Sequence, residues 1–319
     1  MSTLEETARP QRRAAPAGGR GQTRGRRLPF ALALPAWVWL AVFFLVPVLQ
    51  VFWFSLGRKP GMYGTHSNDV LSFDRYVEAF SPTFLTVFTS TLWIGIVGTA
   101  ICALVGIPVA YWMAVRAPAR WRGLLIALVL VPYWTNFLVR TIGWQVILSR
   151  EGWVSSALES VGLIDQPLAL LYTRGALLLG VVYNYLPLMI LPAYVAFDRV
   201  PAALIEASKD LGAGRWRTLT QVTLPIAAPG LVTAGALVFI PLMGDYVTAE
   251  ILGGVRGNMV GQMIAAQFQT AQNWALGSAM AVLLILMIVA TAVTFYAVGR
   301  LLLWPRRLAR RVRLEEVAR

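Results

Sequence analysis

The stretch EASKDLGAGRWRTLTQVTLP, residues 206–225, lies in a polar segment between two long apolar runs. Pro201, just before it, suits the first turn of a helix, and residues 202–211 are mostly good helix formers. Gly212 can then take the left-handed conformation that commonly ends a helix. The spacing predicts a short helix of about three turns over residues 202–211.

One face of this predicted helix has small side chains at its centre. That face consists of four residues at helical spacing: Leu204, Ala207, Ser208 and Leu211. Small residues there allow another backbone to approach closely, and Glu206 on an adjacent face can pair with an arginine of this chain or of a partner. The alternative interpretation is an amphipathic helix lying on the membrane surface, which would not require the glycine that follows.

A second amphipathic stretch, residues 216–222, follows the predicted helix and leads into Leu224 and Pro225. Because proline removes a backbone donor and crowds the preceding turn, Pro225 and Pro229 are predicted to bend the chain into the next apolar run. The whole loop, residues 198–230, is longer and more regular than a simple connection requires.

Around this loop the chain is strongly apolar: 57% of its 319 residues are hydrophobic and 13% are charged, whereas roughly a quarter are charged in soluble proteins. A bilayer core about 30 Å thick requires roughly 20 apolar helical residues. Six stretches meet that length: residues 30–56, 85–114, 124–148, 176–197, 231–251 and 276–304. The sequence therefore predicts an all-α, polytopic membrane protein with six transmembrane helices.

Basic residues predict the orientation of these spans. One set of loops and tails carries 21 of the 28 lysines and arginines, and positive flanks stay cytoplasmic. Both termini are therefore predicted inside, with basic tails at residues 1–27 and 305–319 around a permease domain at 28–304. The first tail is predicted to be disordered and held near anionic lipid headgroups by charge. The first apolar run is too long for a signal peptide and lacks a clear cleavage site, so we expect it to be retained.

Residue counts exclude several kinds of chemistry. With one cysteine, Cys102, and one histidine, His66, the chain can form neither a disulfide framework nor a His/Cys metal cluster. Neither of its two lysines, Lys59 and Lys209, lies in a glycine-rich phosphate-binding loop. We expect no metal, no cofactor, no nucleic-acid partner and no ATP hydrolysis by this chain.

The loop resembles a known signature. The order Glu206-Ala207-Ser208, Gly212 and Leu224-Pro225 is similar to the "EAA" motif of ATP-binding cassette (ABC) importer permeases, in which Glu-Ala-Ala precedes a glycine and then Ile-x-Leu-Pro. Ser208 replaces the second alanine and Val222 replaces the isoleucine. The resemblance implies the type I importer permease fold, with a short helix that docks into a groove on a separate ATPase subunit.

Three further stretches resemble the spermidine/putrescine branch of that family. They are VPYWTNFLVRTIGW from Val131, TLPIAAPGLVTAGALVFIPLMGDYVTAEILGG from Thr223, and NWALGSAMAVLLI from Asn273. The resemblance implies a bacterial inner-membrane importer with two ATPase copies, a second homologous permease and an extracytoplasmic polyamine-binding protein. Other small cargoes, such as an opine, an amino-acid derivative or a metal chelate, remain alternatives.

A polyamine is a flexible cation, so its pathway requires acidic and aromatic groups. The candidate pathway residues are Asp245, Tyr246, Glu250, Trp134, Asn136 and Tyr185. Aromatic residues also mark membrane interfaces, and Asp245 has a second interpretation as the ion-pair partner of Arg140. Both interpretations of Asp245 stay open in the sequence.

Two other classes of protein fit the sequence less well. An ion-driven secondary transporter commonly carries internal repeats, which we do not find, and it gives residues 206–225 no role. A membrane enzyme requires converging reactive groups, which the predicted spans lack.

Overall fold

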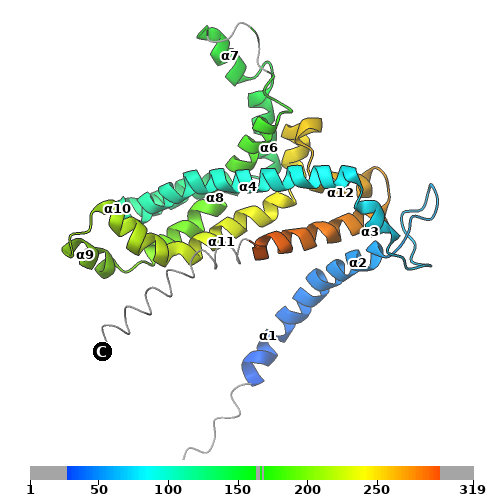
Figure 1. Ribbon diagram of the computed structural model, residues 1–319, viewed down its shortest axis with the longest axis horizontal. Helices are drawn as coiled ribbons and strands as arrows, with labels where there is room; N and C mark the ends of the chain where they lie inside the picture. Colours follow the sequence, from blue (N-terminus) through cyan, green and yellow to red (C-terminus); the bar gives the residue numbers. More distant parts are fainter. Residues whose placement is uncertain (1–26, 163–165, 167–168, 295–319) are drawn as a thin grey trace, which may run out of the picture. The chain divides into compact units, whose positions relative to one another are not determined.

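The computed structural model describes residues 27–162, 166 and 169–294 (Figure 1). The predicted tails at 305–319 and, up to residue 26, at 1–27 lie outside this part. The chain forms two units, Met1–Gln50 and Val51–Arg319. In the first, α1 (Arg27–Leu40) and η1 (Ala41–Leu45) lead into α2 (Val46–Ser55).

Helices are the regular elements of the second unit's described residues, and one isolated bridge joins Arg58 and Ser67 in a loop. Its elements are α3 (Asp74–Ala79), α4 (Pro82–Tyr111), η2 (Trp112–Arg116), α5 (Ala119–Trp134), α6 (Phe137–Leu148), α7 (Trp153–Ser160), α8 (Arg174–Asp198), α9 (Ala202–Asp210), α10 (Arg215–Thr218), η3 (Leu219–Thr223), α11 (Leu224–Met243), η4 (Ala249–Gly253), η5 (Gly254–Gly257) and α12 (Val260–Gln269). A last helix covers Trp274–Thr294. The predicted all-α class is confirmed.

Helices long and apolar enough to cross a membrane correspond to the predicted spans. Five are continuous in the described residues: Ala33–Ser55, Pro82–Arg116, Arg174–Asp198, Arg215–Met243 and Trp274–Thr294. A bent pair of helices supplies a sixth if it counts as one span. The prediction of a polytopic helical membrane protein is therefore confirmed.

The third predicted span, residues 124–148, is not one straight helix. α5 ends at Trp134, and the helix that follows from Phe137 is inclined to it by 84°. Thr135 and Asn136 take extended conformations, and the Asn136 side chain accepts a hydrogen bond from the Leu138 N–H at 2.8 Å. Asn136 thus starts a new helix as its N-cap, four residues after Pro132 of α5.

The fifth span also differs from its predicted bounds of 231–251. The helix starts earlier, at Arg215, and ends at Met243. Gly244 closes it, and Asp245 begins a separate turn that leads into η4. Asp245, Tyr246 and Glu250 therefore lie just after the end of this span, and the carboxylate of Asp245 caps the next turn.

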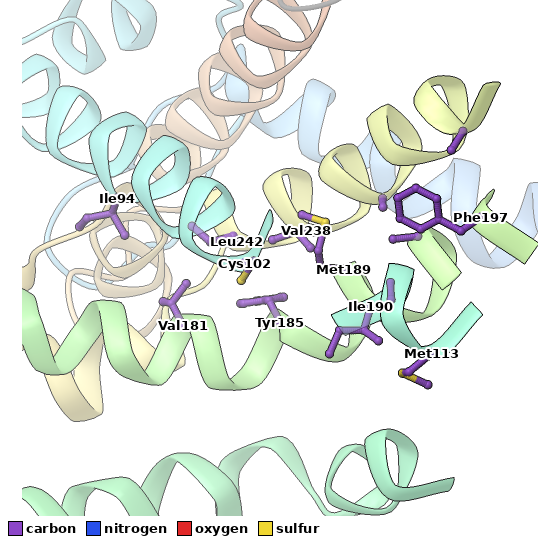
Figure 2. Close-up of a cluster of buried hydrophobic side chains, with 14 of the residues drawn as sticks. Ile94, Cys102, Met113, Val181, Tyr185, Met189, Ile190, Phe197, Val238 and Leu242 are labelled. Carbon is purple, nitrogen blue, oxygen red and sulfur yellow. The ribbon is translucent and has the colours of Figure 1, made fainter. Parts of the chain in front are cut away.

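The core of the second unit lies where α4, α8 and α11 pack together. Figure 2 shows ten of its buried side chains: Ile94, Cys102, Met113, Val181, Tyr185, Met189, Ile190, Phe197, Val238 and Leu242. Within this unit, α9 and α10 lie beyond one end of α4 and α8, and α3 and α12 lie near the other end (Figure 1). The helical core thus connects the 198–230 loop to the opposite face.

Close helix contact in this core depends on Gly230 in α11. A Cβ atom added at Gly230 would collide with the Cβ of Ala196 in α8, whereas one added at Gly235 meets nothing within 4 Å. We expect Gly230→Val to destabilise the chain by about 1–3 kcal/mol through overpacking, and Gly235→Val on the same helix to have little effect. Thermal stability of the purified protein, followed by fluorescence-detected gel filtration, measures this. Equal stability of the two variants would contradict the close α8–α11 contact.

Candidate functional site

The predicted helix in the 198–230 loop is present as α9, Ala202–Asp210. Pro201 precedes it, and Gly212 has φ +77°, the left-handed conformation that the sequence predicted. The Gly212 N–H donates to the Lys209 carbonyl at 2.8 Å, and the Ala213 N–H donates to the Ser208 carbonyl at 3.0 Å. These two bonds form a Schellman cap, so the end of α9 is fixed by the backbone.

The face predicted for docking is divided in the structure. Leu204 and Leu211 are 46% and 88% exposed, and Glu206 and Ala207 are exposed beside them. Ser208 instead is half-buried, and its hydroxyl lies 3.1 Å from the Thr218 hydroxyl of α10. Ser208 therefore contacts α10, whereas Ala207 and Leu211 of the predicted face stay exposed.

Inside the loop, Ile205 anchors α9 by packing against the buried core cluster. Ile205, Glu206 and Lys209 line a cavity of about 320 Å³ between α9 and the ends of α5 and α8. At that end Arg122 Nη1 lies 3.3 Å from Asp198 Oδ1, joining α5 to the end of α8. The packing of Ile205 therefore holds one side of α9 against the core, and the opposite side stays exposed.

Leu224 and Pro225 lie at the start of α11, where Leu224 packs against the core cluster. The helical run from Arg215 to Met243 passes through them without a break. A five-residue π-helix, η3, immediately precedes Leu224, and π segments accommodate a proline that removes a helical donor. The second amphipathic stretch and the span thus belong to one unbroken helical run.

Asp245 is buried, at 6% exposed, and is held within the chain. Its Oδ1 accepts the Thr248 N–H at 3.0 Å, and its Oδ2 accepts the Thr248 hydroxyl at 2.6 Å and the Tyr185 hydroxyl at 3.3 Å. Both carboxylate oxygens are therefore in use. This arrangement fastens the turn after α11 to the middle of α8.

The proposed Asp245–Arg140 ion pair is not formed among the described residues. Arg140 lies instead over the rings of Tyr133 and Phe137, at 5.2 Å and 5.8 Å from their centroids. These rings flank the break between α5 and α6, so cation–π contact holds the guanidinium there.

The other candidate pathway residues remain open to their surroundings. Trp134 is 79% exposed and Tyr246 is 40% exposed, and the Asn136 and Glu250 side chains are exposed as well. Trp134, Tyr246 and Glu250 make no side-chain hydrogen bond within the described part of the chain, whereas Asn136 caps α6. The structure thus joins Tyr185 to Asp245 by a hydrogen bond, and in the described residues no side-chain hydrogen bond links the other four to this pair.

A cavity of about 420 Å³ lies between α4, α8, α11 and the last helix. Thr99 supplies its one polar side chain, and the remaining lining is aliphatic or aromatic apart from Gly235. A cation gains little in such a lining, because a buried charge requires opposite charge or hydrogen-bond partners. This cavity is therefore not the site expected for a cationic cargo.

The helical spans, with a capped helix on the loop between the fourth and fifth, define an integral membrane transport subunit. Residues 106–303 match the family described as "binding-protein-dependent transport system inner membrane component". The chain belongs to this family and is a multi-pass inner-membrane permease component.

Relatives of known name include the spermidine/putrescine transport system permease protein PotB. The protein from Haemophilus influenzae is 34% identical over 83% of this chain and 91% of its own length. PotB of Escherichia coli is 30% identical over 83% of this chain and 95% of its own length. The E. coli inner membrane ABC transporter permease protein YdcU is 25% identical over 81% of this chain and 86% of its own length.

Solved structures show the same fold at lower identity. A chain of a bacterial ABC transporter that imports alginate superposes with a TM-score of 0.65 at 17% identity, covering 86% of this chain and 95% of that one. A chain of the MetNI methionine ABC transporter in an inward-facing conformation gives a TM-score of 0.52 at 20% identity, covering 69% and 98%. The ABC importer permease fold predicted from the sequence is thereby confirmed.

Proposed function

We propose that this chain is the channel-forming permease subunit of an ABC importer that carries polyamines, spermidine or putrescine, into the cell. The observation that carries the proposal is 34% identity to a spermidine/putrescine permease over 91% of that protein's length. The assembly would contain two ATPase copies, a second homologous permease and an extracytoplasmic binding protein. The chain itself makes no covalent bond, and ATP is hydrolysed by the partner.

In this proposal, the ATPase subunit acts on the permease through α9. Glu206, Ala207 and the exposed Leu204 and Leu211 offer charge, close approach and apolar area to the ATPase subunit. Ligand-driven coupling requires that the ATPase contact this surface differently in its open and closed states. Because Leu224 and Pro225 lie on the helix from Arg215 to Met243, displacement of the loop shifts a membrane span.

Cargo recognition is divided between two groups of residues. Glu250, Tyr246 and Trp134 are exposed and without side-chain hydrogen bonds in the described part, so they are available to a cation through charge and cation–π contact. Asp245 and Tyr185 hold the turn that presents Tyr246 and Glu250. The exposed group is proposed to contact the cargo, and the buried group to position it.

Competition for uptake tests the cargo assignment. Vesicles containing the assembled importer and its binding protein should take up radiolabelled spermidine or putrescine, and an excess of either unlabelled polyamine should reduce that uptake about tenfold, as occupancy by mass action requires. Uptake that resists both polyamines but is inhibited by an opine, an amino-acid derivative or a metal chelate would overturn the polyamine assignment.

A further inference from the structure

Two hydroxyl groups connect α9 to the helix that ends in the membrane. Ser208 Oγ on α9 and Thr218 Oγ1 on α10 are 3.1 Å apart, and Thr218 is 6% exposed. Among residues 27–162, 166 and 169–294, this is the one side-chain hydrogen bond between α9 and another element. The C-terminal half of α9 therefore has a single polar link to the rest of the fold.

The backbone between α9 and α10 is poorly suited to carry a force. The cap bonds hold Gly212 and Ala213, but Gly214 follows them, and glycine is the most permissive residue in backbone conformation. The other anchor of α9, Ile205, packs against the core nearer its N-terminal end. Without the hydroxyl pair, no side-chain hydrogen bond in the described residues would join α9 to α10.

Thr218 lies on the continuous helix Arg215–Met243, so a force applied at Thr218 acts on a membrane span. In the importer signature that this loop resembles, alanine stands where this chain has Ser208. Alanine has no donor or acceptor in its side chain. The hydroxyl link is thus a feature of this chain's own residues.

We propose that Ser208 and Thr218 are positioning residues that transmit movement of α9 to the span Arg215–Met243. The proposal rests on the proposed ATPase docking at α9 and adds the contact by which that docking reaches the membrane. We call the hydrogen-bonded pair of Ser208 and Thr218 the strut. When the exposed side of α9 is displaced, Thr218 moves with it and α11 follows.

Removing the strut leaves the fold intact. After Ser208→Ala, the Thr218 hydroxyl can rotate to its own helix and donate to the Gly214 carbonyl four residues back, as Thr side chains in helices commonly do. The Thr218 N–H already donates to that carbonyl at 3.0 Å, so the local geometry is helical. The variant therefore loses the connection between two elements without leaving a buried hydroxyl unpaired.

The ratio of cargo molecules imported to ATP hydrolysed is the first test, using the full importer in vesicles. We expect Ser208→Ala and Thr218→Ala each to lower this ratio about two- to tenfold, the range of one hydrogen bond, and the double variant to go no lower than either single one. The exchanged pair Ser208→Thr with Thr218→Ser should restore it. Thr220→Ala is the matched control, since the Thr220 hydroxyl donates within its own helix to the Trp216 carbonyl at 2.8 Å.

A distance measurement tests the strut without any cargo, which separates its failure from failure of the proposed function. Spin labels at Asp210→Cys and Val232→Cys, in a Cys102→Ala background, report the α9–α11 distance in the assembled complex. Ser208→Ala should broaden the distance distribution, and Thr220→Ala should not. Unchanged widths, an unchanged import ratio, or additive effects in the double variant would overturn the proposal. If Ser208→Ala broadened the distribution in a complex that imports no polyamine, the strut would be supported and only the cargo assignment would be wrong.

Discussion

Replacing Gly212 with proline is expected to abolish ATP-driven uptake while leaving the chain inserted in the membrane. Gly212 has φ +77°, whereas the proline ring fixes φ near −65°. The substitution also removes the N–H that donates to the Lys209 carbonyl at 2.8 Å. Strain of this kind costs about 1–3 kcal/mol, so the cap opens and the end of α9 loses its direction. Uptake should fall to background, measured beside the amount of protein in the membrane.

The matched control for this prediction is the same substitution two positions along. Gly214 has φ −66°, which proline can adopt, and a Cβ atom there meets nothing within 4 Å. Gly214→Pro should therefore keep most of the uptake. Normal uptake by Gly212→Pro, or equal loss in both variants, would contradict the role assigned to the α9 cap.

Replacing Asp245 is expected to have the second large effect, and to act through stability as well as transport. Asp245→Ala removes the acceptors for three hydrogen bonds, from the Thr248 N–H, the Thr248 hydroxyl and the Tyr185 hydroxyl. Each contributes about 1–3 kcal/mol when the acceptor is charged, so we expect a loss of about 3 kcal/mol or more. The midpoint temperature of thermal unfolding of the purified chain should fall, and uptake should fall with it.

Thr248→Val separates a positioning role of Asp245 from direct cargo contact. It removes one of the hydroxyl donors and keeps the carboxylate, so a positioning role predicts lower stability and lower uptake together, at about 1–2 kcal/mol. Glu250→Gln is the control for loss of an exposed carboxylate in the same segment, and it should change the KM for cargo and leave stability unchanged. If Thr248→Val retained full uptake while Asp245→Asn raised only the KM, Asp245 would contact the cargo.

Local sequence signals were sufficient for the coupling loop. Pro201 and Gly212 bracket α9 to within about one residue of its observed ends, because caps depend on neighbouring residues alone. The existence of the spans was also predictable, since each contains a long apolar run, but the break in the third span and the start of the fifth at Arg215 were not. Helical spacing also grouped Ser208 with Ala207, but it could not say which side of α9 would meet Thr218.

The sequence alone did not predict contacts between residues that are far apart along the chain. The Tyr185–Asp245 hydrogen bond joins residues 60 positions apart, and no local pattern indicates that their spans meet. Asn136 was assigned to the pathway because it is polar within an apolar run, yet the same property makes it an N-cap that breaks the third span. The asparagine was compatible with a helix start, but only the folded structure shows that the third span breaks there.

In the proposed importer, this permease moves polyamine only when a separate ATPase acts on α9. The most direct measurement is uptake of labelled spermidine by vesicles that hold the complete importer, with ATP present or absent on the ATPase side and with no ion gradient. We expect uptake with ATP, none without it, and none in vesicles made with Gly212→Pro. Uptake that continues without ATP and follows an imposed ion gradient would contradict the account and indicate a secondary transporter.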